Sequence, residues 1–449
     1  MSSRLWTRLG AAVAVGLGVL ALASVPAAAR PYHIAINHRF GQPPTTSQCL
    51  TTMGIACYNP AQFQRAYDMG PLYSAGLNGT GKTIVIVDSF GSPTIESDLK
   101  TFDTEQGLPA PPSLRIIAPA GPIPKFDPGN ATMVGWAEET SLDVEYAHAM
   151  APGANILLVE TPVAETEGVT GFPQIIASEN FVINHHLGDV ISQSFGATEQ
   201  TFPNVGSLLN LRSAYKNALR NHVSVLAGAS DFGATDAELN GVDLYTHRAV
   251  DWPASDPLVT AVGGTQLHLT DNGSRTAPDN VWNDQELLQM PVAGGGGPSR
   301  VFSRPDYQNS VQSVVGGARG LPDVSLSAAV NGGANVYLGF TGSGITPGWY
   351  VFGGTSEATP LFSGVVAVAD QAAGHDLGLL NPALYSIGDG AGSGLVDITL
   401  GDNSVSFKQH DKTHHVVGFE AVPGYDMASG LGTVDGAKLV AQLQALPHH

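Results

Sequence analysis

A glycine-rich stretch in the last quarter of the chain carries the residues best suited to nucleophilic chemistry. Residues 354–360 read GTSEATP, after the apolar run 350–353 and before a run of small apolar residues, 361–371. This pattern predicts a strand, a tight turn and a buried helix, with Ser356 at the positive end of the helix dipole. That position suits a nucleophile, although a capping hydroxyl is the commoner role for a single Ser. The flanking Gly, Ala and Pro favour the nucleophile, because a helix cap requires none of them.

A nucleophilic serine needs a base, and no histidine motif provides one. Subtilisin-like peptidases also carry a G-T-S-x-A-x-P stretch, but their base is a His that is followed by Gly. None of the 14 histidines here is followed by Gly. Asp88, in VDSFG, resembles the aspartate motif of those enzymes but has no His partner. We therefore expect a base of another type.

Two carboxylates could provide that base. Glu139 and Asp143 lie four residues apart in a predicted helix, 137–149, so they share one helical face. A partly buried pair of this kind can share a proton, and the raised pKa makes a carboxylate an adequate base. The alternative is a solvated acidic face that includes Glu138 and Glu145, and on spacing alone this alternative is the commoner.

A third carboxyl group lies at the end of a predicted strand. Asp231, in AGASDFG, follows the predicted strand 223–226, so we expect it at the edge of the sheet where loops carry function. A protonated carboxyl there could donate a hydrogen bond to an oxyanion. The alternative is a turn Asp before Gly, which is common.

Strands and helices alternate along the chain, which predicts an α/β fold with a mostly parallel central sheet and helices on both faces. The expected strands are 83–88, 114–118, 155–160, 189–194 and 223–228, and the expected helices are 96–106, 137–149, 173–187 and 207–221. Residues 76–83, GLNGTGKT, fit the phosphate-binding loop, but a strand follows them instead of a helix. We interpret them as a turn that enters the first strand, and nucleotide binding through Lys82 is a remote alternative.

The N-terminus and the composition indicate export. Residues 1–29 have Arg4 and Arg8, then an apolar core too short to span a bilayer, then an A-x-A site at 27–29, as in a signal peptide. The two cysteines, Cys49 and Cys57, are expected to form a disulfide in an exported protein. The net charge of −19 argues against nucleic acid and anionic membranes as partners and favours tolerance of acid.

Taken together, the motifs resemble those of the sedolisins, the serine-carboxyl peptidases with a subtilisin-like fold, over residues 58–445. The matching stretches, in family order, are TIVIVDSFG (83–91), ETSLD (139–143), AHAMAPGA (147–154), SFG (194–196), SDFG (230–233), WPAS (252–255), VTAVGG (259–264), VWN (281–283), RGLPDV (319–324) and the serine loop. Each stretch alone is a weak signal, whereas their conjunction is specific.

The resemblance implies a role for each residue. Ser356 would attack a peptide carbonyl, Glu139 would take its proton, Asp143 would hold Glu139, and protonated Asp231 would stabilise the oxyanion. Residues 194–196 and the glycine run 294–297 would pair with the substrate backbone. The implied activity is acid peptide hydrolysis on protein or peptide substrates.

The C-terminal segment resembles the family's single calcium site. Carried over position by position, the ligands would be the carboxylates of Asp397 and Asp426 and the carbonyls of Ile398, Val422 and Gly424. Calcium favours hard oxygen ligands of this mix. The family often has Gly where Val422 stands, and two Asp-containing turns are the alternative interpretation.

The expected organisation is a signal peptide (1–29), an N-terminal arm (30–75) and a catalytic domain with its calcium segment (76–449). Family members commonly carry a long prodomain, and the arm is all that we expect in its place. We expect a secreted monomer without membrane attachment once the signal is removed. Endopeptidase and tripeptidyl-peptidase action, and a silent binding protein of the same fold, remain open alternatives.

Overall fold

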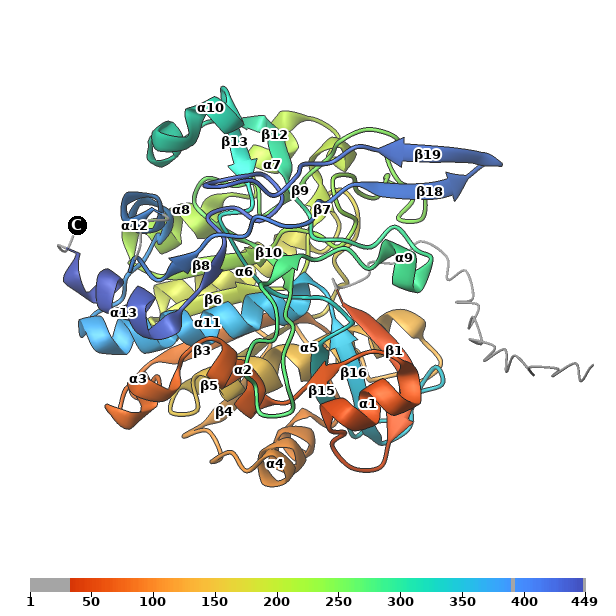
Figure 1. The fold of residues 1–449 in the computed structure, drawn as a ribbon, viewed down its shortest axis with the longest axis vertical. Coiled ribbons are helices and arrows are strands. Elements are labelled where there is room, and N and C mark those ends of the chain that lie inside the picture. Colours follow the sequence, from red (N-terminus) through yellow and green to blue (C-terminus); the bar gives the residue numbers. More distant parts are fainter. Residues whose placement is uncertain (1–32, 389–391, 447–449) are drawn as a thin grey trace, which may run out of the picture.

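An eight-stranded sheet forms the centre of the part of the chain that the computed structural model describes, residues 33–388 and 392–446 (Figure 1). The strand order is β11-β10-β8-β6-β3-β5-β4, and β14 also pairs with β10. Every pair is parallel except β10 with β11. The bounds are β3 Thr83–Ser89, β4 Leu114–Ile117, β5 Asn155–Thr161, β6 Val190–Gln193, β8 Ser224–Gly228, β10 Thr260–Gln266, β11 Asn280–Val281 and β14 Val324–Ser327. The predicted α/β fold with a mostly parallel sheet is confirmed.

Helices cover both faces of this sheet, because its strands are apolar on both sides. In β3, Ile84 and Ile86 enter one core and Val85 and Val87 enter the other. The first core is shared with two long helices, and the second with helices of the opposite face (Figure 1). The first pair is α5 Ala131–Met150 and α11 Thr355–Ala373, which pack together, and the others include α6 Phe172–Asn184 and α8 Ser213–Arg220.

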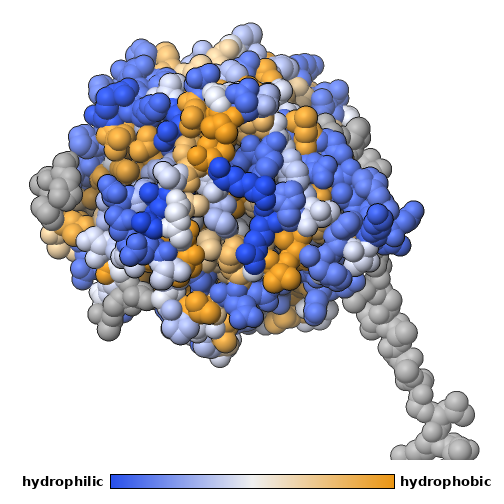
Figure 2. Space-filling model, turned by 90° about the horizontal axis from the view of Figure 1, so that it is seen from above, coloured by the Kyte–Doolittle hydropathy of each residue, from blue (hydrophilic) through white to orange (hydrophobic). Residues whose placement is uncertain are grey.

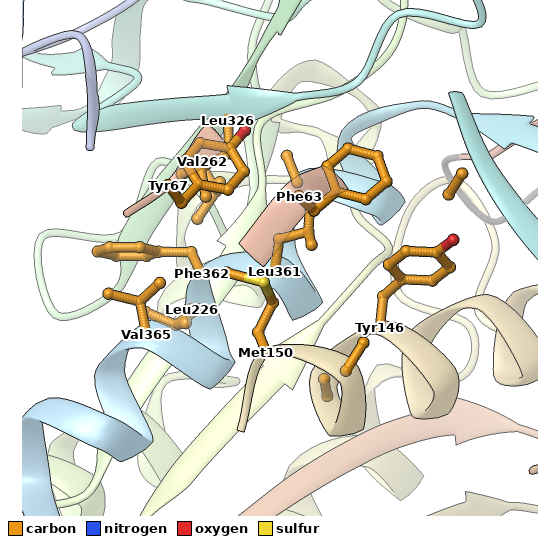
Figure 3. Close-up of a cluster of buried hydrophobic side chains, with 14 of the residues drawn as sticks. Phe63, Tyr67, Tyr146, Met150, Leu226, Val262, Leu326, Leu361, Phe362 and Val365 are labelled. Carbon is orange, nitrogen blue, oxygen red and sulfur yellow. The ribbon is translucent and has the colours of Figure 1, made fainter. Parts of the chain in front are cut away.

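Figure 3 shows the first core where strand and helix side chains meet. Leu226 and Val262 come from adjacent strands of the sheet, Phe362 and Val365 from α11, and Met150 from the end of α5. All five residues are fully buried. Such burial stabilises each large apolar side chain by roughly 1.5–3 kcal/mol, so the packing holds α5 and α11 firmly on the sheet.

Two helix predictions differ from the structure. The expected helix 137–149 begins earlier, at Ala131, because the Asn130 side chain accepts hydrogen bonds from the next turn and caps it. The expected helix 207–221 is two helices, α7 Val205–Leu209 and α8 Ser213–Arg220. The connection between them is held by Arg212, whose guanidinium donates two hydrogen bonds to Asp256 at 2.5 and 2.7 Å.

A second sheet joins the expected arm to the serine-bearing part of the chain. Its strand order is β1-β16-β15-β2, with β1 Ile34–Phe40, β2 Cys57–Tyr58, β15 Gly333–Leu338 and β16 Gly348–Gly353. The helices of this N-terminal region are α1 Thr46–Met53, α2 Pro60–Ala66 and α3 Gly70–Ser74. Cys49 of α1 and Cys57 of β2 form the expected disulfide. The described part of the arm is therefore built into the fold through two strands.

The phosphate-loop match at 76–83 is a turn, as interpreted from the sequence. Thr83 begins β3 directly after it. The Lys82 Nζ lies 2.5 Å from Asp376 Oδ1, so this lysine is held in an ion pair. Because no helix follows the glycines, this turn has no helix N-terminus that could hold a phosphate group.

The remaining elements surround the two sheets. They are α4 Ile95–Gln106, β7 Ala197–Thr198, η1 Glu199–Thr201, β9 Asp251–Trp252, α9 Gln285–Leu288, β12 Gly297–Ser303, η2 Asp306–Val311, α10 Gln312–Val315, β13 Ala318–Leu321, α12 Asn381–Ile387, β17 Leu395–Val396, β18 Val405–Gln409, β19 Lys412–Val416, β20 Thr433–Val434 and α13 Gly436–Ala445. Figure 2 shows one face of the surface, on which hydrophobic patches lie scattered among hydrophilic residues. Within the described ranges, no helix has the length and apolar character needed to cross a bilayer.

Candidate active site

Ser356 lies in the first turn of α11, directly after β16. Gly354 makes the turn between them with φ 109°, a left-handed backbone conformation that favours glycine. Ser356 is fully buried, and its Oγ has no hydrogen-bond partner among the described residues. The positive end of the α11 dipole therefore lies beside an uncommitted hydroxyl, as the sequence predicts.

Asp231 is bound to the residue that precedes Ser356. Its Oδ1 accepts hydrogen bonds from the backbone N–H of Thr355 at 2.7 Å and from the Thr355 hydroxyl at 2.8 Å. Its Oδ2 has no partner among the residues described. Burial raises the pKa of Asp231 to about 8, against the two Thr355 hydrogen bonds, which lower it. A protonated Asp231 therefore has a free O–H donor beside Ser356.

Backbone packing allows Asp231 to lie close to the start of α11. Ser230 has φ 88°, so the chain turns sharply after β8 and carries Asp231 toward α11. A Cβ on Gly228 would lie 2.9 Å from the Thr355 hydroxyl, so only glycine lets β8 and the start of α11 approach so closely. Gly228 thus allows the close approach of β8 to the serine turn.

Glu139 and Asp143 are both fully buried on α5. Ser194 Oγ donates a hydrogen bond of 2.9 Å to Asp143 Oδ1. Burial raises the pKa of Asp143 well above its ordinary value, and the charges of Glu139 and Asp88 raise it further. The solvated acidic face considered above is therefore excluded for this pair, and Asp143 retains its proton far above the usual range of a carboxyl.

Asp88, which has no histidine partner in the sequence, has no hydrogen-bond partner for either carboxyl oxygen among the described residues, but it lies close enough to Glu139 to feel its charge. Asp88 is fully buried near the end of β3. Burial raises its pKa well above the ordinary value, and the charge of Glu139 is the next cause. The signal in the sequence that points to Asp88 is its position at the carboxyl end of a predicted strand. Asp88 thus extends the Glu139–Asp143 pair to three buried carboxyl groups.

The site also contains His33, which belongs to none of the motifs in the sequence. Its Nδ1 lies 2.5 Å from Glu139 Oε2, and its Nε2 lies 3.1 Å from Glu138 Oε2. The other Glu139 oxygen, Oε1, has no partner among the described residues.

The structure buries all four sequence-predicted residues. Asp231 reaches Ser356 through Thr355, while the charge of Glu139 contributes to the raised pKa of Asp231. Helices α5 and α11, which carry Glu139 and Ser356, pack against each other. No hydrogen bond joins Glu139 to the Ser356 hydroxyl among the described residues, so proton transfer between them requires a movement that brings the two groups into contact.

The glycine run 294–297, expected to pair with substrate, is packed into the fold. The amides of Gly294 and Gly295 donate to the carbonyls of Trp282 and Ser230 at 3.0 and 2.8 Å. A Cβ on Gly295 would lie 1.7 Å from the Ala229 carbonyl oxygen. The amides of Gly294 and Gly295 therefore support the chain around Asp231 and are not free to bind a substrate backbone.

The two Asp residues of the expected calcium segment lie in adjoining loops, which β17 and β20 hold together. The Gly424 N–H donates to Asp397 Oδ2 at 3.0 Å, and the Val422 N–H donates to Asp426 Oδ2 at 2.9 Å. No described residue donates a hydrogen bond to the carbonyls of Ile398, Val422 or Gly424. Two carboxylates and three uncommitted carbonyls fit an oxygen-ligated cation.

Several known proteins are similar to this chain in sequence. Kumamolisin from Bacillus sp. is 32% identical over 398 residues, which cover 87% of this chain and 63% of that protein. The tripeptidyl-peptidase sed5 from Aspergillus fumigatus is 30% identical over 333 residues, covering 69% and 52%. The chain thus spans less than two thirds of each relative. No family model matches the sequence.

A solved structure is similar to this chain in fold. Pseudomonas sedolisin, described as a serine-carboxyl proteinase in complex with two molecules of pseudo-iodotyrostatin, superposes with a TM-score of 0.68. Its sequence is 27% identical, and the match covers 87% of this chain and 99% of that one. The fold is therefore of the subtilisin-like α/β class. The chain belongs to the sedolisin family, as the motif order predicted.

Proposed function

We propose that the chain is a secreted, acid-active serine-carboxyl endopeptidase that cuts protein or peptide substrates through Ser356. The observation that carries the proposal is the hydrogen-bonded link from Asp231 through Thr355 to the serine turn, with Glu139 and Asp143 buried nearby. The similar tripeptidyl-peptidase from Aspergillus fumigatus and the similar serine-carboxyl proteinase from Pseudomonas support the reaction class.

In the proposed reaction Ser356 Oγ attacks the peptide carbonyl carbon, and Glu139 accepts the hydroxyl proton. The carbonyl oxygen becomes an oxyanion, to which protonated Asp231 donates a hydrogen bond through Oδ2. Glu139 then passes its proton to the leaving amine as the C–N bond breaks, leaving an acyl ester on Ser356. Water hydrolyses the ester with Glu139 again as the base. Asp143 supports Glu139 because its own proton is retained at a raised pKa.

The proposal is tested by hydrolysis of an acid-denatured protein near pH 4. Wild-type protein should cut it, Ser356→Ala should not, and Ser363→Ala should retain activity. Ser363 is a matched control because it is buried on the same helix and, within the described part of the chain, its hydroxyl bonds only to the Pro360 carbonyl, at 2.8 Å. Equal hydrolysis by Ser356→Ala and wild type would contradict the proposal.

Tripeptidyl-peptidase action is the second candidate, because a tripeptidyl-peptidase is among the similar proteins. A peptide with an acetylated N-terminus separates the two activities. An endopeptidase cuts it, whereas a peptidase that requires a free N-terminus does not. A silent binding protein of the same fold is the third candidate. It would bind peptides without cutting them at any pH.

We also propose that one calcium ion is held by Asp397 and Asp426 with the carbonyls of Ile398, Val422 and Gly424. The described residues hold no group of three or more His, Cys, Asp or Glu side chains suited to a metal, so the backbone carbonyls would be essential ligands. When bound, the ion would cross-link the two loops and stabilise the fold. The signal peptide proposed for export, 1–29, lies outside the described residues.

A further inference from the structure

The loop that carries Asp231 is hydrogen-bonded to the glycine run that follows Ala293. The Asp231 carbonyl accepts the Ala293 N–H at 3.0 Å, and the Ala293 carbonyl accepts the Gly233 N–H at 2.9 Å. A further bond joins the Gly295 N–H to the Ser230 carbonyl at 2.8 Å. Asp231 therefore lies in a short ladder of backbone hydrogen bonds, and the position of its backbone depends on that ladder.

The conformation of Ser230 makes this support necessary. Its φ of 88° lies in the left-handed region, which residues other than glycine rarely adopt. Such a conformation costs free energy and persists only where the surrounding structure holds it. Because Ser230 directly precedes Asp231, relaxation of its backbone would redirect the Asp231 carboxyl group and move Oδ2 away from the serine turn.

Asn403 bonds to both sides of the ladder. It lies fully buried in the loop between β17 and β18. Its carbonyl accepts the Ala234 N–H at 2.9 Å, and its side-chain Nδ2 donates to the Gly294 carbonyl at 3.2 Å. Ala234 continues the loop of Asp231, and Gly294 belongs to the glycine run. A residue of the C-terminal segment thus fastens these two stretches to each other.

Asn403 is itself held firmly. Its N–H donates to the Phe419 carbonyl at 3.2 Å, and its Oδ1 accepts the Phe419 N–H at 2.8 Å. Asn283 fixes the backbone on either side, because its Nδ2 donates to the carbonyls of Asp402 and Ser404 at 3.1 and 2.9 Å. Each polar atom of Asn403 therefore has a partner, and the amide nitrogen is directed toward the glycine run.

We propose that Asn403 is a positioning residue of the proposed peptidase, which holds the loop of Asp231 so that the free Oδ2 meets the oxyanion. The inference rests on the proposed function of Asp231 as the oxyanion donor. Asn403 acts through the backbone of that loop and not on the substrate itself. Through this residue, the C-terminal segment sets the geometry of a carboxyl group that is distant in sequence.

The chemistry of the side chain predicts which replacements Asn403 tolerates. An amide donates through nitrogen and accepts through oxygen, as the Gly294 carbonyl and the Phe419 N–H require. Alanine loses both contacts and leaves two buried backbone groups without partners. A protonated Asp keeps both, because its O–H donates and its other oxygen accepts. Asn403→Asp should therefore replace the native residue in acid, where a buried carboxyl is protonated.

The first test measures kcat and KM at pH 4. We expect Asn403→Ala to lower kcat by about tenfold or more and to leave KM within about twofold, because an oxyanion donor acts mainly in the transition state. Asn403→Asp should recover most of the lost kcat. If Asn403→Ala does not fold, Asn283→Ala takes its place, with a loss of about threefold or more expected in kcat. Wild-type kcat in the variant tested would overturn the proposal.

Asn381 provides the matched control. It is also fully buried, its Nδ2 donates to the Val259 carbonyl at 2.9 Å, and its Oδ1 accepts the Thr260 hydroxyl at 2.7 Å. Asn381→Ala therefore removes a comparable buried amide away from the loop of Asp231. It should lower the Tm and keep wild-type kcat. Equal losses of kcat in Asn381→Ala and Asn403→Ala would overturn the positioning role, because general destabilisation would then explain both.

A double-variant cycle identifies the group through which Asn403 acts. In an Asp231→Ala background, Asn403→Ala should lower kcat little further, since no carboxyl group is left to position. In an Asp143→Asn background, Asn403→Ala should keep its full effect, because Asp143 belongs to the other part of the proposed machinery. Equal further losses in the two backgrounds would overturn the proposal.

A further test does not depend on catalysis. Amide hydrogen exchange is compared in Ser356→Ala protein with and without Asn403→Ala. The amides of Gly233, Ala234 and Gly295 should exchange about tenfold faster or more in the double variant, while those of β3 should not change. Equal exchange of the three amides in the two proteins would overturn the proposal.

The tests separate the positioning role from the proposed function. If exchange rises as expected but wild type cuts no peptide at any pH, the proposed peptidase function fails, and the positioning role fails with it. If wild type cuts and Ser356→Ala does not, but Asn403→Ala keeps wild-type kcat, only the positioning role fails.

Discussion

Asp231 and Thr355 are joined by two hydrogen bonds that end on the same carboxyl oxygen. The N–H and the hydroxyl of Thr355 both donate to Oδ1, at 2.7 and 2.8 Å, and Oδ2 is left without a partner among the described residues. The carboxyl group is thereby oriented by the residue next to Ser356. Burial raises its pKa to about 8, so Oδ2 can carry a proton over the whole acidic range.

Replacing Asp231 tests the oxyanion role. Asp231→Ala should lower kcat by roughly 10²–10³-fold, the usual effect of losing one oxyanion donor. Asp231→Asn should keep part of the activity, since an amide can accept from Thr355 and still donate through its nitrogen. The decline of kcat toward alkaline pH should also flatten in Asp231→Asn, because its donor does not titrate. An Asp231→Ala variant as active as wild type would remove Asp231 from the mechanism.

Asp143 should act through Glu139. Asp143→Asn should lower kcat and shift the acid limb of the pH–rate profile, because Glu139 loses a neighbour that can share its proton. Glu145→Gln is the matched control, since Glu145 is buried two residues further along α5, accepts from the Tyr337 N–H at 3.1 Å, and also has a raised pKa caused by burial. The measurement is the steady-state pH–rate profile of kcat for the two variants. Equal effects would mean that the buried helix, and not the pair, sets the rate.

Stability should fall as the pH rises above 5. Burial raises the pKa of Asp231 to about 8, of Asp236 to about 7 and of Glu179 to about 8. A carboxyl whose pKa is raised by folding contributes fully below its unfolded value, here 3.8 or 4.5, and loses that contribution as the pH rises through its folded value. Chemical denaturation at pH 5 and pH 8 should therefore show a lower free energy of unfolding at pH 8.

Glu179→Gln isolates one of these groups. Glu179 is fully buried on α6, away from the proposed catalytic cluster, and neither carboxyl oxygen has a partner among the described residues. Each unit of pKa shift corresponds to about 1.4 kcal/mol. The variant should recover roughly 1–3 kcal/mol of unfolding free energy at pH 8 and change little at pH 5. A stability that is flat or rising between these pH values would contradict the assignment.

Chelation tests the calcium proposal. Excess chelator should lower the Tm of wild type, because a ligand that binds only the folded state stabilises it. Asp397→Asn and Asp426→Asn should melt lower without chelator and respond less to it. Asp435→Asn is the control, since Asp435 caps α13 through the Lys438 N–H and is not a proposed ligand. An unchanged melt in chelator would remove the calcium site.

Local sequence pattern is enough to propose the catalytic residues, but not to find the residues that pack around them. Glu139 and Asp143 follow from helical spacing, and Asp231 follows from its place after a strand, because local pattern determines both. His33 could not be found this way, since it lies 106 residues from Glu139 in sequence and reaches it only through the pairing of β1 with β16. The burial of Gly294 and Gly295 likewise depends on long-range packing that a glycine run alone does not reveal.

The account depends most on Ser356 and Glu139 acting as one unit, and a double-variant cycle measures this directly. The kcat at pH 4 is determined for Ser356→Ala, Glu139→Gln and the double variant. Groups that work in one step lose most of the rate together, so each single change should cost on the order of 10⁴-fold or more and the double change no more than either. A Glu139→Gln variant with nearly full kcat, or a double loss equal to the product of the single losses, would contradict the carboxyl–serine relay.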